Sequence, residues 1–180
     1  MLSRREKILY VDFSSPTKIT DRKVLPGDDK FVIANKEGEL ITLDEHKRLY
    51  PYQLDNDITV EVVTSVRVIS FTIPAGYVWN GADIPKLLWP AVGSQHNPEF
   101  KDASMVHDYM LEFKWDIYKP PLSLEISIAD YRRLTSLIFR QILKNVGVPT
   151  IKANIMSGAV QFFQAVFNRK QWKQEEKHED

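Results

Sequence analysis

The sequence predicts an α+β fold in which N-terminal antiparallel strands pack with a C-terminal bundle of about three helices. In the first half of the chain apolar and polar residues alternate, as in strands, and in the second half apolar residues recur every three or four positions, as in helices. With 180 residues, 43% of them hydrophobic, the chain can bury a core as one compact domain. We divide it into a strand-rich extension (residues 1–70), a loop and helical core (71–169) and a charged, flexible tail (170–180).

Two pairs of strands are predicted in the first half. Residues 31–34 and 39–43 form two short strands about a turn in which Gly38 adopts a positive φ. Residues 58–73 alternate more regularly, and their apolar positions change parity near Thr64. This change indicates a turn or a bulge between two further strands, with residues 64–65 as the candidate position.

Three helices are predicted in the second half. The second of these helices begins at Ser127, whose spacing to Asp130 matches a capping box, and this helix ends at Gly147. The third spans about residues 150–168 and is apolar around most of its circumference, so it is either central in the core or docks on a partner. The first carries a face of similarly spaced, mostly apolar residues: Phe100, Ala103, Val106, His107, Met110 and Phe113.

The composition excludes several classes of function. The chain has no cysteine, which excludes disulfide scaffolds, thiol nucleophiles and Cys-ligated metals. Its 24 Lys and Arg balance 24 Asp and Glu, so we expect no nucleic-acid partner, because binding phosphates needs a surplus of positive charge. No apolar stretch is long enough for a signal peptide or a membrane span.

Candidate site residues lie on the loop that ends the strands and on the helix that follows. Asn80 and Asp83 flank a tight turn beside Trp79, and such side chains either act in a site or cap the turn. His107 and Asp108 are neighbours on the next helix. A neutral imidazole beside carboxylates could be a general base or a metal ligand, or a buried His that joins the helix to the Trp79 loop.

Asp130 is the remaining carboxylate of interest. It could complete a site, but the spacing to Ser127 favours an N-terminal cap. If the set binds a cofactor, a divalent metal ion held by His107, Asp108, Asp83 and Asp130 is the candidate, since no thiolate is present.

Taken in order, these motifs resemble a phage- and prophage-associated family of unknown function, domain of unknown function thirteen fifty-three. The resemblance covers about residues 71–167 and depends on the order of the motifs more than on any one of them. The motifs are Ile73–Pro85, Leu87–Pro90, His107–Tyr109, Ala129-Asp130 and Val146–Pro149.

The resemblance implies that the polar residues form one cluster. The family pattern has Asp-Gly-Ala-Ser in the loop, whereas this chain has Asn80 in place of the Asp and Asp83 in place of the Ser. If that Asp carries catalysis, this member is altered or inactive. If the cluster binds a metal, Asp83 restores the lost carboxylate.

Two kinds of function follow as expectations. The first is a phage-encoded accessory or virion protein, associated with the tail or neck, whose His/Asp cluster is structural or binds a ligand and whose partners are proteins of the particle or the host. The second is a small metal-assisted hydrolase, acting for example on cell-wall material, with His107, Asp108 and Asp130 as the catalytic set. Either would be found in the host cytoplasm or the virion.

Overall fold

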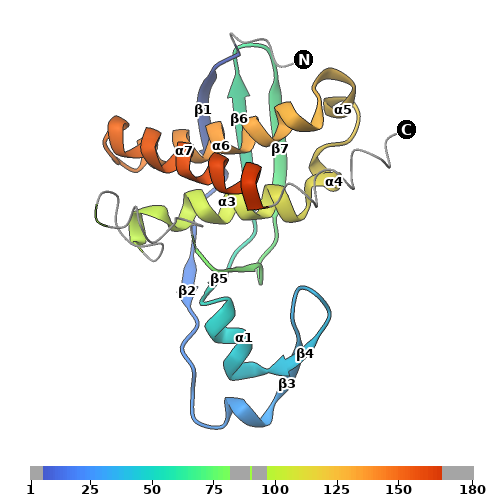
Figure 1. Cartoon of the computed structure of the whole chain (residues 1–180), viewed down its shortest axis with the longest axis vertical. Helices are drawn as coiled ribbons and strands as arrows, with labels where there is room; N and C mark the ends of the chain where they lie inside the picture. Colours follow the sequence, from blue (N-terminus) through green and yellow to red (C-terminus); the bar gives the residue numbers. More distant parts are fainter. Residues whose placement is uncertain (1–5, 82–89, 91–96, 168–180) are drawn as a thin grey trace.

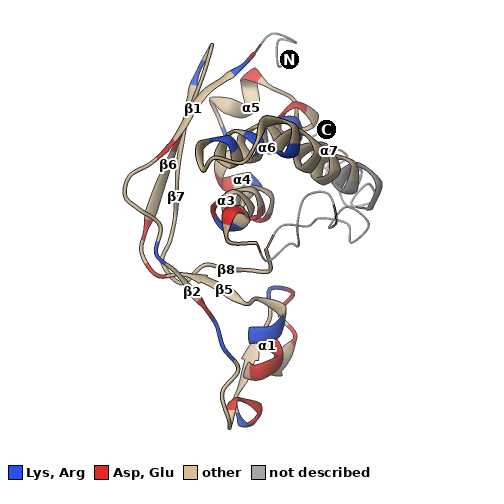
Figure 2. Cartoon of the chain, turned by 90° about the vertical axis from the view of Figure 1, so that its left-hand side faces the viewer, with Lys and Arg blue, Asp and Glu red and all other residues tan. Residues whose placement is uncertain are grey.

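The computed structural model describes residues 6–81, 90 and 97–167, and side chains up to residue 162. It has an antiparallel sheet covered on one face by helices, and a smaller lobe that projects from one end (Figure 1). Turned by a quarter, the sheet and the helices form two layers with the lobe below them (Figure 2). The predicted α+β architecture is confirmed.

The main sheet has three strands in the order β1-β6-β7. They are β1 (Ile8–Phe13), β6 (Ile58–Thr64) and β7 (Val68–Ile73). β6 and β7 form the predicted hairpin, and the turn follows Thr64 as expected. The alternating residues Ile58, Val60 and Val62 of β6 are buried beneath the helices.

The second strand of that hairpin differs in one respect from the sequence pattern. Val66 and Val68, which share the parity of the buried β6 residues, are exposed. The core face of β7 is made by Ile69 and Ile73 instead. The buried positions are even-numbered in β6 and odd-numbered in β7, because the hairpin turn between the two strands shifts the alternation by one residue.

A second antiparallel sheet lies below the first and joins the lobe to the rest of the molecule. Its order is β2-β5-β8, formed by β2 (Ile19–Asp21), β5 (Tyr52–Leu54) and β8 (Val78–Trp79). The chain leaves this sheet at β2 and returns at β5. We call the intervening residues 22–51 the lobe (Figure 1).

The lobe contains one predicted hairpin and two elements that were not predicted. β3 (Val32–Ala34) and β4 (Leu40–Thr42) pair about a turn in which Gly38 has a φ of 82°, as expected. The 3-10 helix η1 (Asp28–Lys30) precedes them, and helix α1 (Leu43–Leu49) follows β4 without a break.

The helical layer follows the predicted order with three short additions. The long helices are α3 (Lys101–Glu112), α6 (Ile128–Asn145) and α7 (Thr150–Phe167), with η3 (Pro98–Phe100) before α3, and α4 (Lys114–Ile117) and α5 (Leu122–Glu125) between α3 and α6. α6 ends where Gly147 adopts a φ of 88°. In the described part of the chain no helix is long and apolar enough to span a membrane.

Helix α7 lies on the outside of the layer against α6, and its faces differ. Met156 and Val160 are buried, whereas Ile151 and Phe162 are exposed. The helix is therefore not central in the core, which was one of the two expectations for an apolar helix of this kind.

Candidate functional site

The site begins with Trp79, which β8 carries under α3. Pairing with Tyr52 of β5 fixes its position in the strand. Its side chain is 1% exposed, and its Nε1–H donates to the Ser104 hydroxyl at 3.1 Å. Trp79 therefore fastens the end of the strand to α3. The next residue, Asn80, is exposed.

His107 and Asp108 lie on consecutive positions of α3, and their side chains contact each other. The His107 Nδ1 atom is 3.2 Å from the Asp108 Oδ1 atom. His107 is 4% exposed, and its ring meets the Phe139 ring of α6 edge-on at 5.6 Å. The imidazole is thus held between the carboxylate of its own helix and the aromatic ring of the next.

Asp108 lies in a setting that disfavours its charge. Its side chain is 17% exposed, and burial raises the pKa of the Asp108 carboxyl above its ordinary value. The contact with His107 and the positive charge of Lys36 oppose this rise in pKa, and the negative charge of Glu112 adds to it. Asp108 therefore takes up a proton more readily than an exposed aspartate does.

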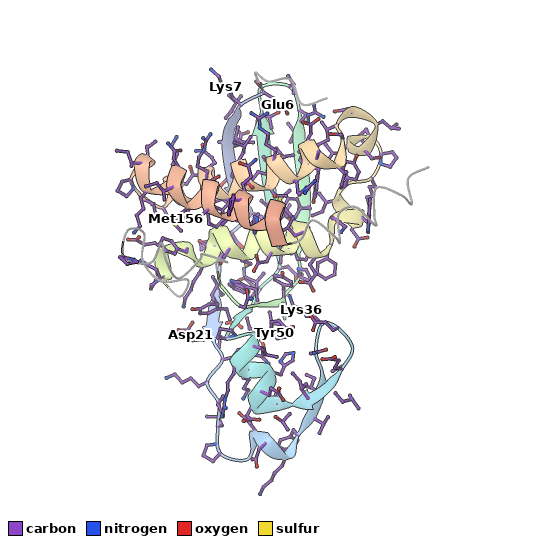
Figure 3. The ribbon with its side chains drawn as sticks, in the orientation of Figure 1. Glu6, Lys7, Asp21, Lys36, Tyr50 and Met156 are labelled. Atoms are coloured by element: carbon purple, nitrogen blue, oxygen red, sulfur yellow. The ribbon has the colours of Figure 1, made fainter. Side chains whose placement is uncertain are left out.

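Glu112 joins α3 to the lobe. The Tyr77 hydroxyl donates to the Glu112 Oε2 atom at 3.1 Å, and the Lys36 ammonium from the β3–β4 turn forms an ion pair with the same carboxylate. The Lys36 Nζ atom also lies 4.6 Å from the centre of the Tyr77 ring and 5.2 Å from that of Tyr50. Figure 3 shows Lys36 and Tyr50 facing each other at the boundary between lobe and core.

Tyr77 is almost enclosed by this arrangement. Its ring stacks on Trp79 at 6.1 Å and meets Tyr109 edge-on at 5.1 Å. Burial, followed by the negative charges of Asp108 and Glu112, raises the pKa of the Tyr77 hydroxyl far above its ordinary value. Tyr77 therefore acts as a neutral hydrogen-bond donor throughout the range in which proteins work.

Asp130 belongs to the first turn of α6. Its backbone N–H donates to the Ser127 hydroxyl oxygen at 3.1 Å, and that hydroxyl donates to the Asp130 carboxylate at 2.9 Å. Phe139, the residue of α6 that contacts His107, lies nine positions further on, about 13 Å along the helix axis. The predicted capping geometry is present.

The described residues do not supply a metal site. Among residues 6–81, 90 and 97–167, no three His, Asp or Glu side chains are grouped so as to hold a metal ion. Asp83, a predicted member of the cluster, lies outside the described residues, as does the tail 170–180.

Sequence reasoning missed the roles of Lys36 and Glu112, and one signal could have pointed to Glu112. Asp108 and Glu112 stand four positions apart on one face of α3, where two like charges destabilise a helix. A nearby cation or a raised pKa relieves such repulsion, and the structure has both.

Comparison with known proteins gives one match. The model of a family described as protein of unknown function (DUF1353) matches residues 52–160, well over half of the chain. The match begins at residue 52, ahead of the predicted start near Phe71, and so includes β5, β6 and β7. No curated protein and no solved structure matches the chain.

Proposed function

Since the chain belongs to the DUF1353 family of proteins of unknown function, we propose a role from its own structure. The chain is a phage-encoded accessory or virion protein, associated with the tail or neck, and it binds a protein partner through its lobe. It would be found in the particle or in the cytoplasm of the host. The observation that carries the proposal is the composition of the lobe surface.

The lobe has no apolar core of its own. Between Val11 and Tyr52, all of which the structure describes, no hydrophobic side chain is fully buried. Polar contacts hold the lobe together instead: Lys47 forms an ion pair with Asp28 at 2.8 Å, and Arg22 hydrogen-bonds to the Tyr50 carbonyl at 2.9 Å. The buried residues of the lobe are His46 and Asp28, both polar.

Most apolar residues of the lobe lie on its surface, whereas Ile41 and Leu43 are half-buried. Leu40 is 77% exposed and Phe31 is 63% exposed. Burial of such side chains contributes about 1.5–3 kcal/mol each, and this contribution is absent in the isolated chain. A lobe that exposes most of its apolar side chains and whose buried side chains are polar is suited to a partner surface that covers it. Its exposed apolar residues are Val24, Leu25, Phe31, Val32, Ile33, Leu40 and Leu49.

In this proposal the polar cluster holds the lobe at a fixed place on the core. Lys36 reaches Glu112 from the lobe, and Lys101 of α3 forms a second ion pair with Asp21 of β2 at 2.5 Å. The Lys101 Nζ atom also lies 4.7 Å from the centre of the Tyr52 ring. Lys36 ties the lobe itself to α3, and Lys101 ties α3 to the strand from which the lobe begins. A lobe held in this way presents its apolar surface in one orientation, which reduces the entropy cost of binding.

The test is incorporation into phage particles. We would purify particles made with the wild-type chain, with the double variant Phe31→Ser/Leu40→Ser, and with Ile151→Ser as a matched control, since Ile151 of α7 is 76% exposed. We expect wild type and control in the particle and a loss of about tenfold or more for the double variant, measured by quantitative mass spectrometry. Circular dichroism checks that all three chains fold.

Two results would contradict the proposal. One is the absence of the wild-type chain from particles together with normal assembly after its gene is deleted. The other is equal incorporation of the double variant and the Ile151→Ser control.

A small metal-assisted hydrolase, acting for example on cell-wall material, is the second candidate. It is supported by the contact between His107 and Asp108 and by the raised pKa of the Asp108 carboxyl, because perturbed acids beside a His are frequent in active sites. If it holds, purified cell wall incubated with the chain and a divalent cation releases soluble fragments. His107→Asn then abolishes release with little change in melting temperature. The pair has a structural role instead if the wild-type chain releases no fragments and His107→Asn lowers the melting temperature.

A further inference from the structure

We propose that a groove beside strand β7 binds an extended, uncharged peptide segment of a partner protein, which adds a strand to the sheet. This site is separate from the lobe and does not depend on the function proposed above. The groove has a volume of about 430 Å³ and lies between β7 and residues 116–125.

The first step is that, among the residues that the structure describes, the main-chain groups on the outer edge of β7 have no partner strand. Thr64 donates its N–H to the Arg67 carbonyl at 2.9 Å, while the Thr59 carbonyl accepts from Ser14 on the β1 side at 2.9 Å. The backbone N–H and C=O groups of the even-numbered β6 residues therefore face β7, where their partners are Ile69, Phe71 and Ile73. The main chain of the alternate residues of β7 points away from β6: Val68, Ser70 and Thr72.

These outward groups have no strand beside them. β7 is an edge of the sheet β1-β6-β7, and within residues 6–81, 90 and 97–167 no strand pairs with its outer side. Five residues, from Val68 to Thr72, span about 17 Å in an extended strand. An exposed edge of this kind is the template for β-strand addition.

The second step is that residues 116–125 flank this edge of β7 and that apolar side chains line the groove between them. Phe71 stacks on Tyr109 with ring centres 6.1 Å apart, and Ile117 and Leu122 also line the groove. Pro120 and Pro121 line it as well and have no N–H to offer. The hydrogen bonds to a bound peptide must therefore come mainly from β7.

Ion pairs hold one end of the groove. Arg67 pairs with Glu6 at 3.0 Å and with Glu125 of α5 at 2.5 Å, and Glu6 is buried. Figure 3 shows Glu6 at the end of the sheet where β6 turns into β7. This network joins the residue just before β7 to α5 at that end of the groove.

The charges of the groove define the chemistry of the peptide. Arg67 and Lys119 balance Asp116 and Glu125, so the lining is neutral as a whole. A neutral, partly apolar groove complements an uncharged segment with apolar side chains at every second position, which an extended strand turns to one face. A helix does not fit, since its main chain is hydrogen-bonded internally and would leave the β7 edge unpaired.

Residues 116–125, which flank the β7 edge, argue against a second copy of this chain as the occupant of the groove. Pairing of β7 with the β7 strand of a second copy would bring residues 116–125 of both copies to the same edge. A single strand enters such a groove more easily than the edge of another walled sheet does.

The test uses nuclear magnetic resonance on the ¹⁵N-labelled full chain. The probe is a pooled library of acetylated and amidated heptapeptides with Val, Ile, Leu or Phe at every second position and Thr or Ser between them. We expect saturable shifts of the Val68, Ser70 and Thr72 amide signals. We expect Ser70→Pro, which removes one outward N–H, to weaken binding about fivefold, with Ser70→Ala as the matched control.

A second measurement leaves the protein unchanged. Two forms of the tightest-binding peptide are made, each N-methylated at alternate backbone nitrogens, so that one form lacks the N–H groups of one strand edge and the other form lacks those of the opposite edge. One form should lose binding and the other keep it, because only one edge of the peptide faces β7. Equal binding of the two forms, or no saturable shift at the three amides, would overturn the proposal. So would a wild-type dimer in analytical ultracentrifugation that Ser70→Pro dissociates, since the occupant would then be a second copy.

Discussion

At the scale of single residues, the His107–Asp108 pair shows how burial sets chemistry. Two neighbours on a helix point about 100° apart, yet these side chains meet, with 3.2 Å between the ring nitrogen and the carboxylate oxygen. The Phe139 ring packs edge-on against His107, and the side chains of His107 and Asp108 are only 5% and 17% exposed. The carboxyl group responds with a raised pKa.

The raised pKa of Asp108 makes a prediction about stability and pH. Between the pKa of the unfolded chain, about 3.9, and the higher pKa of the folded chain, the folded state binds more protons, so this carboxyl makes stability fall as pH rises. Asp108→Asn removes that contribution. The free energy of unfolding of the variant relative to wild type should therefore increase from about pH 4 to about pH 7, measured by urea unfolding.

The control for this experiment is Asp29→Asn, which removes an exposed carboxylate of η1. It should give a smaller change over the same range of pH. A relative stability of Asp108→Asn that decreases with pH would show that ion pairing, rather than burial, dominates at Asp108.

At the scale of elements, the hydrogen bonds at the first turn of α6 give Asp130 a role in the N-terminal cap of that helix. The reciprocal bonds between Ser127 and Asp130 satisfy one free N–H of the helix and place a negative charge at its positive end. The same spacing was visible in the sequence. A carboxylate used in this way stabilises the helix whether or not it has another task.

Ser127→Ala tests the capping role. We expect a loss of about 1 kcal/mol in the free energy of unfolding, because the Asp130 N–H loses its acceptor. Chemical denaturation measures the loss, and Ser123→Ala on α5 is the control, for which we expect a change within about 0.5 kcal/mol. A loss no larger than that of the control would mean that the cap contributes nothing to the fold.

At the scale of the whole molecule, the lobe and the core have different stabilising forces. Apolar side chains from the main sheet and from α3, α6 and α7 form one continuous core, whereas the lobe is held by ion pairs and hydrogen bonds. Lys36 connects the lobe to Glu112 of α3, and Lys101 connects α3 to Asp21, the residue just before the lobe. The lobe is thus the part of the described chain with most to gain from a partner that covers apolar surface.

The sequence by itself determined the elements with strong local signals. The β6–β7 hairpin and α3 follow from hydrophobic periodicity, and α6 follows from periodicity, a cap and a terminal glycine. β1 was missed because its apolar residues do not alternate, and α1 because it is short and follows β4 directly. Local patterns act over a few residues, so they fix which segments are helix or strand.

Only the tertiary structure decided which side chains meet. Lys36 and Glu112 are 76 positions apart, and nothing near Lys36 distinguishes it from other surface lysines. The open edge of β7 likewise depends on which strand becomes its neighbour and on how residues 116–125 return across it. Contacts of this kind depend on the packing of the whole chain, and local periodicity carries no information about them.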